Sequence, residues 1–185
     1  MGLRVLIKMS SVEFHKFREN INNIDDYTDQ KEKIFDNFID QGLPNKRNES
    51  WKYFDLASKA KEYIKNDISN SDIIVENLEE NNVFYDYADN NLSIEDYLKP
   101  CNFFKGESVV DLNVACGNQI KILDVKHNQN EPIIIKINYN EKNISLPRLI
   151  INIADNIKAK INYVNSSTSG FLNLLVEYNI GNRSE

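Results

Sequence analysis

Apolar side chains recur at helical intervals in the first third of the chain, so that in each stretch they fall on one face of a helix. These positions are Val12, Phe14, Phe17 and Ile21, followed by Ile34, Phe35, Phe38 and Ile39. Thr28 is a favourable N-cap for the second stretch, and Gly42 stands where a left-handed residue ends a helix. The pattern predicts a helical region over residues 10–65, continued by the apolar positions between Trp51 and Ile64.

After Phe104 the period of the apolar positions changes to two, which is typical of half-buried strands. Five short strands are predicted, at 120–125; at Ile133, Ile135, Ile137 and Tyr139; at Leu149, Ile151 and Ile153; at Ile157, Ala159, Ile161 and Tyr163; and at Leu172, Leu174, Val176 and Tyr178. Asn, Ser and Gly residues lie between them. The strand sequences show no strict repeat, so periodicity leaves both a β-sandwich and a β-solenoid open.

The segment between these regions is polar and acidic. Residues 66–92 contain a short apolar island at 73–75, and their composition predicts a loop-rich linker. Ser93 and Asp96 open a predicted short helix that ends before Pro100. The expected class is therefore α+β, with three parts: a helical region over 1–65, an acidic linker with a short helix over 66–105, and a β portion over 106–185.

Charge and hydropathy exclude some classes of partner. Residues 1–105 contain 14 Lys or Arg and 20 Asp or Glu, whereas residues 106–185 contain 8 of each. Such an acidic first half does not favour a nucleic-acid partner, which requires a basic surface. No apolar run reaches the roughly 20 residues that span a bilayer, and the N-terminus does not resemble a signal peptide. We expect no membrane partner and a cytoplasmic location, with a plastid as the alternative.

The residues that could carry chemistry do not form a recognisable site. Cys101, Cys116, His15 and His127 lack the spacing of a zinc site, and both cysteines are predicted to be small buried side chains. The sequence contains no phosphate-binding loop and no nucleophile elbow. Nothing selects two carboxylates for acid–base catalysis. The sequence therefore predicts no enzyme, and no catalytic, cofactor-binding or metal-binding residue.

The most distinctive stretch is 42–56, GLPNKRNESWKYFDL, which contains the only tryptophan of the sequence. Taken alone, it predicts a second helix on which Trp51 and Phe54 share one face, as Tyr53 and Leu56 do. Aromatic side chains in such a position usually pack. Trp51 and Tyr53 are therefore predicted to be anchors of a core or an interface.

The same stretch resembles the signature of the SufD family of iron–sulfur cluster assembly subunits. The matching residues are Gly42, Leu43, Pro44, Arg47, Glu49, Trp51, Lys52, Tyr53, Asp55 and Leu56. Phe54 stands where the family usually has threonine. Segments 111–116, 131–134, 147–151 and 173–178 are similar to later family blocks in the same order. The related SufB subunit has a Glu-Pro-Glu-Trp motif, which this sequence lacks.

The resemblance implies that residues 106–185 form the first coils of a right-handed parallel β-helix. It also implies a non-catalytic scaffold subunit, or an N-terminal fragment of one, in the SUF complex with SufB-like and SufC-like partners. That complex assembles an iron–sulfur cluster and its partner ATPase uses ATP, whereas this fragment is expected to bind no cofactor. Family members continue beyond the position of Glu185 with the regions that contact the partners and carry cluster-forming residues. None of those residues is carried over.

Two further expectations follow from the strands. A β-helix that stops near Tyr178 has an uncapped last coil, and solenoids without caps tend to associate, so self-association is predicted. The alternative reading is an autonomous β-sandwich binding module with a helical extension, for a carbohydrate or a peptide. Tyr139, Tyr163 and Tyr178 could line its surface, although they continue apolar faces and are better explained by core packing.

Overall fold

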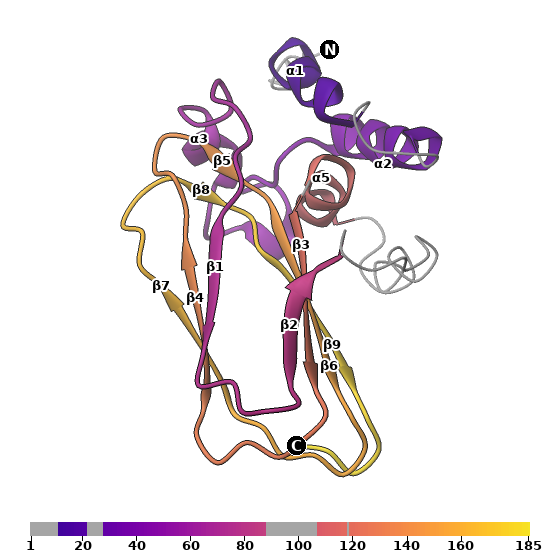
Figure 1. Ribbon diagram of the computed structural model, residues 1–185. Helices are drawn as coiled ribbons and strands as arrows, with labels where there is room; N and C mark the ends of the chain where they lie inside the picture. The colour runs from indigo at the N-terminus through magenta and orange to yellow at the C-terminus, as the bar shows by residue number, and fades with distance from the viewer. Residues whose placement is uncertain (1–10, 22–27, 88–106, 118) are drawn as a thin grey trace, which may run out of the picture.

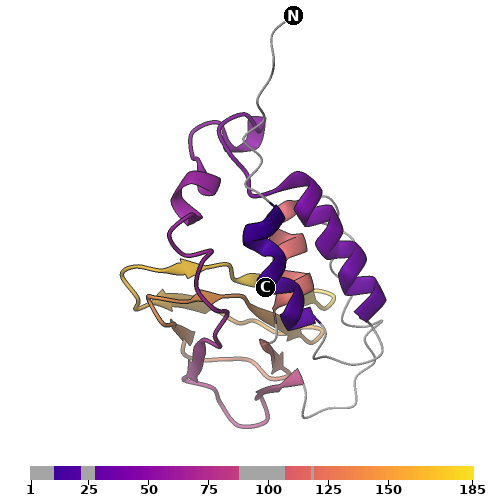
Figure 2. The same cartoon turned by 90° about the horizontal axis from the view of Figure 1, so that it is seen from above.

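The computed structural model describes residues 11–21, 28–87, 107–117 and 119–185 (Figure 1). Its architecture is mixed α+β, as the sequence predicts. Helices gather at one end of a set of long strands, at the top of Figure 1. Seen from above in Figure 2, α1, α2 and α5 lie together on one side, and the segment that contains α3 lies on the other.

Three helices share one apolar core. They are α1 (Ser11–Ile21), α2 (Thr28–Gln41) and α5 (Ser108–Cys116). The predicted faces of the first two are confirmed, because Phe14, Phe17, Ile21, Phe35 and Phe38 are all buried. The rings of Phe14 and Phe38 meet edge to face with 4.9 Å between their centroids. This geometry is a favoured one for aromatic pairs and fixes α1 against α2.

Helix α2 ends as predicted, and the next segment does not. Gly42 has a φ of +69°, and its N–H donates to the carbonyl of Phe38 at 2.7 Å, which closes the helix. The chain then forms a short 3₁₀ turn, η1 (Glu49–Trp51), and a separate helix α3 (Leu56–Ala60). The prediction of one helix through the tryptophan is wrong because Asp55 caps a new helix by accepting from the N–H of Ser58 at 3.0 Å.

The predicted acidic linker contains two strands. The apolar island lies in β1 (Asp72–Glu76), and β2 (Val83–Asp86) follows it. β1 pairs antiparallel with β4, and β2 pairs antiparallel with β3. The loop-rich assignment is therefore wrong for these residues, because tertiary pairing supplies the hydrogen bonds that their polar composition does not predict. The short helix predicted at 93–98 and Cys101 lie outside the described residues.

Together with β1 and β2, the remaining strands form three sheets. They are β3 (Gln119–Val125), β4 (Ile133–Asn138), β5 (Ile144–Ser145), β6 (Pro147–Ile153), β7 (Ile161–Asn165), β8 (Phe171–Leu172) and β9 (Leu175–Ile180). The sheet orders are β1-β4-β7, β2-β3-β6-β9 and β5-β8. Gln119 pairs with Pro147, and Arg148 pairs with Leu175, so the chain lies on itself again after 28 and then 27 residues.

Every strand pair within the described part of 119–180 is parallel. The alternative of two facing antiparallel sheets is therefore wrong for this region. The predicted strand positions are largely confirmed, with three differences. Residues 157–160 are not in a strand, residues 173 and 174 separate β8 from β9, and residues 108–116 are helical where the β portion was expected to begin.

Helix α5 is fixed to the strands by two asparagines. The Asn113 side-chain amide donates to the carbonyls of Pro147 at 3.1 Å and Asn173 at 2.6 Å. The Asn173 amide donates in return to the carbonyl of Val109 at 2.7 Å. Gly117 then turns the chain into β3. A Cβ at this position would lie 2.5 Å from the Asn113 oxygen, so only glycine fits.

Candidate functional site

A row of polar side chains crosses the β2-β3-β6-β9 sheet. Asp124 on β3, Asn152 on β6 and Asn179 on β9 pair in register, and they alternate with core residues such as Ile151 and Ile153, so they lie on the outer face. The Asn179 amide donates to the Asn152 side-chain oxygen at 2.8 Å, and the Asn152 amide donates to Asp124 Oδ1 at 2.7 Å. The row links three strands through side chains as well as backbone.

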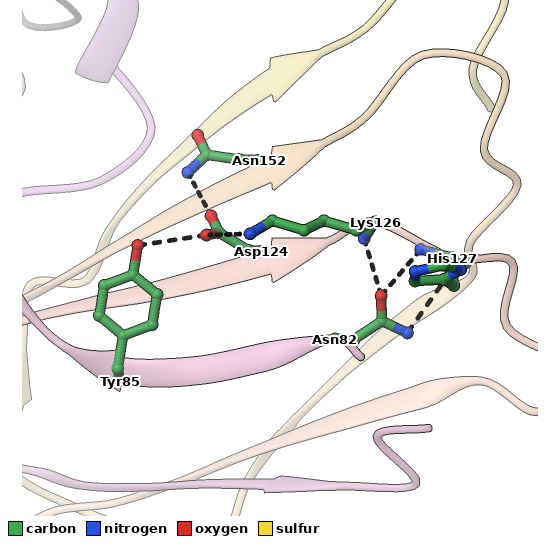
Figure 3. Close-up of polar contacts among 6 residues, drawn as sticks. All are labelled: Asn82, Tyr85, Asp124, Lys126, His127 and Asn152. Carbon is green, nitrogen blue, oxygen red and sulfur yellow. Dashed lines mark hydrogen bonds and ion pairs between the residues drawn. The ribbon is translucent and has the colours of Figure 1, made fainter. Parts of the chain in front are cut away.

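Asp124 is the most connected member of the row (Figure 3). Its Oδ2 accepts from the Tyr85 hydroxyl at 3.2 Å and lies 3.7 Å from Lys126 Nζ. Burial raises the pKa of Tyr85, and the charge of Asp124 and this hydrogen bond raise it further. Tyr85 therefore stays protonated at neutral pH and serves as a donor.

The turn after β3 is fixed by Asn82. Its side-chain oxygen accepts from the backbone N–H groups of Lys126 at 2.7 Å and His127 at 2.9 Å (Figure 3). His127 contacts the Asn82 side chain through its backbone N–H and carbonyl groups, and not through its imidazole ring. This arrangement places Lys126 at the end of the polar row. Its side chain, which carries the ammonium group, is 58% exposed.

A shallow hollow of about 570 Å³ lies beside the row. Its lining includes Asp124, Lys126, Asn152 and Asn179. These groups offer hydrogen-bond donors, acceptors and one ammonium group. Across the described ranges, no three His, Cys, Asp or Glu side chains are grouped to hold a metal ion. The contacts assign the row a structural role in holding the strands in register.

The last long strands, β7 and β9, expose part of the face that continues the core. Tyr163 on β7 and Tyr178 on β9 pair with core residues of the preceding coil, Ile135 and Ile151, and hydrogen bond to each other through their hydroxyls. Their exposed fractions are 40% and 45%, and that of Ile180 is 59%. Partial burial and the hydroxyl contact raise the pKa of Tyr163. Tyr139 packs against the core, as predicted. Tyr163 and Tyr178 are exposed, so the prediction of core packing is wrong for these two, although they pair in register with core residues.

A buried ion pair supports the same sheet. Arg148 on β6 is 1% exposed, Glu177 on β9 is 6% exposed, and Arg148 Nε donates to Glu177 Oε1. Two charges of opposite sign in such a dry position stabilise each other and leave a strong penalty if one is removed. The pair therefore fixes the position of β9, the edge strand of this sheet.

Of the four cysteine and histidine candidates, the structure describes the side chains of Cys116 and His127. Cys116 is buried, as predicted, and burial raises the pKa of its thiol to about 12, with a smaller opposing effect of Lys31. A thiol in this state is a poor nucleophile at neutral pH. Cys101 lies outside the described residues, and the His15 side chain is not described.

The structure separates the residues of the Trp51 signature. Trp51 is half-buried, whereas Tyr53 is 89% exposed and Phe54 49% exposed. The prediction that Tyr53 anchors a core is therefore wrong, because the backbone turns between η1 and α3 direct it to solvent. Trp51 and Phe54 instead line an apolar groove.

Sequence reasoning missed the polar row, although a signal was present. The segments ILDV, IINI and EYNI at 122–125, 150–153 and 177–180 place a polar residue before a β-branched residue, at the spacing of the parallel strand pairs. A search for periods near 28 residues identifies this repeat.

No family model, curated protein sequence or solved structure matches this chain. The helices that the structure describes are too short or too polar to cross a membrane.

Proposed function

We propose that this chain is a non-catalytic scaffold subunit of a SUF-type iron–sulfur cluster assembly complex. In this proposal, residues 119–180 form the first coils of a right-handed parallel β-helix. The chain itself binds no cofactor, the partner ATPase uses ATP, and the complex acts in the cytoplasm or a plastid. The Trp51 signature and the order of helices before parallel strands support the proposal.

One observation carries the scaffold role. The two ends of the stacked strands differ, because β1 and β2 pair antiparallel with the first coil, whereas β7 and β9 are the outer strands at the other end. Strand β7 has no charged residue or proline, and the only charge of β9 is Glu177, which is buried. Exposed edge strands usually carry such residues to prevent pairing, so we infer that this end meets a protein partner.

The proposal is tested by co-expressing the tagged chain with the SufB-like and SufC-like subunits of the same genome. We expect both subunits to be captured with the chain. Tyr178→Asp should reduce capture at least tenfold, since it places a charge on the exposed inner face. Ile74→Ser is the matched control, because Ile74 is 40% exposed but lies on β1 at the opposite end. Failure of the unaltered chain to capture either subunit overturns the proposal.

Without partners, the chain is expected to self-associate through the same end. Burying one large apolar side chain contributes roughly 1.5–3 kcal/mol, and Tyr163, Tyr178 and Ile180 are all substantially exposed. Light scattering at micromolar concentration should show species larger than a monomer. Tyr178→Asp should shift the distribution to monomer and Ile74→Ser should not. A monomer at all concentrations would contradict this prediction.

A further inference from the structure

An apolar groove lies between the Trp51 segment and the last coil. Its volume is about 380 Å³, and its lining includes Trp51, Phe54, Lys59, Tyr63, Phe171 and Leu174. The groove is separate from the exposed coil end and from the polar row, because none of its lining residues belongs to β7 or β9.

The wall that carries the aromatic side chains is held by local backbone contacts. The N–H of Phe54 donates to the Trp51 carbonyl at 2.8 Å, and the N–H of Ala57 donates to the Pro44 carbonyl at 2.9 Å. Asp55 caps α3 directly after the turn. Phe54 therefore remains 49% exposed and is continuous with the other apolar side chains of the groove, and contiguous apolar surface of this kind marks contact sites.

The segment that carries the aromatic wall of the groove has a net charge opposite to that of the chain. Residues 44–65 contain six basic and three acidic side chains, whereas the whole chain has a net charge of −6. Two of the acidic groups are engaged: Glu49 lies 2.8 Å from Lys52, and Asp55 accepts from α3. Lys59 lies in the groove lining itself. The segment that carries the aromatic wall is thus net positive, and its Lys59 lies in the lining of the apolar groove.

We propose that this groove binds an amphipathic helix of a partner protein, with an apolar face toward Trp51 and Phe54 and acidic residues toward Lys59. Helices that dock in grooves use apolar anchors three and four residues apart, and complementary charge at the rim selects the partner. This inference does not depend on the SUF proposal, because it rests on the groove and its charge. It identifies a second contact surface, which shares no lining residue with the hollow beside the polar row.

The sole tryptophan of the sequence provides the measurement, since Trp51 lines the groove. The probes are two synthetic peptides of about 15 residues, long enough to become helical on binding. Both carry leucine at helical spacing and lack tryptophan and tyrosine, and they differ in having glutamate or lysine on the polar face. We expect saturable change in Trp51 emission with the acidic peptide and at least tenfold weaker binding of the basic peptide.

Two variants locate the binding. Phe54→Ser should weaken binding of the acidic peptide about tenfold. Ile74→Ser, at an apolar position on β1 that is 40% exposed against 49% for Phe54, should leave the affinity unchanged. Lys59→Glu should weaken the acidic peptide and strengthen the basic one. Equal affinity for both peptides, no saturable change with either, or no effect of Phe54→Ser overturns the proposal. If Trp51 emission changes with protein concentration in the absence of peptide, the groove binds a second copy of the chain. That result also overturns the proposal.

Discussion

Replacing Glu177 with leucine should lower the free energy of unfolding by about 3–5 kcal/mol, because it removes the carboxylate that accepts from the buried Arg148 guanidinium. The loss of packing between β6 and β9 is small by comparison, since leucine fills a similar volume. Urea denaturation of the variant and the unaltered chain measures the difference.

The double variant Arg148→Met with Glu177→Leu tests the cause of the lower stability. It distinguishes the loss of the ion pair from a change in side-chain shape. Replacing both members of a buried ion pair by apolar residues is often neutral, so most of the lost stability should return. Lys158→Met is the surface control, because Lys158 and Glu185 form an ion pair with side chains 70% and 73% exposed. Its effect should stay within about 0.5 kcal/mol. A double variant no more stable than Glu177→Leu alone would show that shape dominates.

The substitution Phe38→Ala is expected to cost about 3–5 kcal/mol, the usual cost of truncating a buried phenylalanine. Phe38 is fully buried in α2, where its ring meets Phe14 from α1 at 4.9 Å and Phe35 at 6.0 Å. The cavity would remove the contact that joins α1 to α2. Thermal and urea unfolding followed by circular dichroism measure the effect.

Tyr53→Ala is the matched aromatic control for Phe38→Ala. Tyr53 is 89% exposed, with the Lys52 ammonium over its ring at 5.3 Å, so its truncation should change stability by about 0.5 kcal/mol or less. Similar losses of stability for Phe38→Ala and Tyr53→Ala would contradict this prediction. They would show that the packed aromatic core does not set the stability of the helical end.

The two contact surfaces proposed above make separable predictions about partners. Tyr178→Asp acts at the exposed coil end, where strand pairing would occur, and Phe54→Ser acts at the groove. One possible result is that the chain captures neither SUF subunit but binds the acidic peptide at the groove. The chain would then be a binding protein that belongs to a different assembly. The reverse result would leave the scaffold proposal intact and remove the groove from it.

The local sequence alone determines the helical core and the strand positions. Phe14 and Phe17, and then Phe35 and Phe38, are at helical spacing, and Gly42 can adopt the left-handed conformation that ends α2. Alternation likewise places β3, β4 and β6, because a strand with one face in the core must alternate. These features depend on neighbours within a few residues, which a sequence displays directly.

Features that depend on distant residues were decided by the tertiary structure. Helix α5 lies at the start of the predicted β portion, and its position is set by Asn113, whose amide reaches carbonyls 34 and 60 residues away. The same is true of β1, a strand in an acidic segment that pairs with β4. The right-handed β-helix itself and the SUF assignment stay predictions.

The candidate site shows the same division. Asp124, Asn152 and Asn179 are ordinary surface residues in the sequence, and they become a row only because parallel pairing repeats after 28 and 27 residues. The sequence identified Trp51 as distinctive but predicted a helix face for it. Asp55 instead begins a new helix, and the turn before it leaves Tyr53 in solvent while Phe54 lines a groove whose other wall is formed by residues more than 100 positions later. Spacing along a chain predicts local faces, whereas a surface built by two distant segments exists only after the chain has folded.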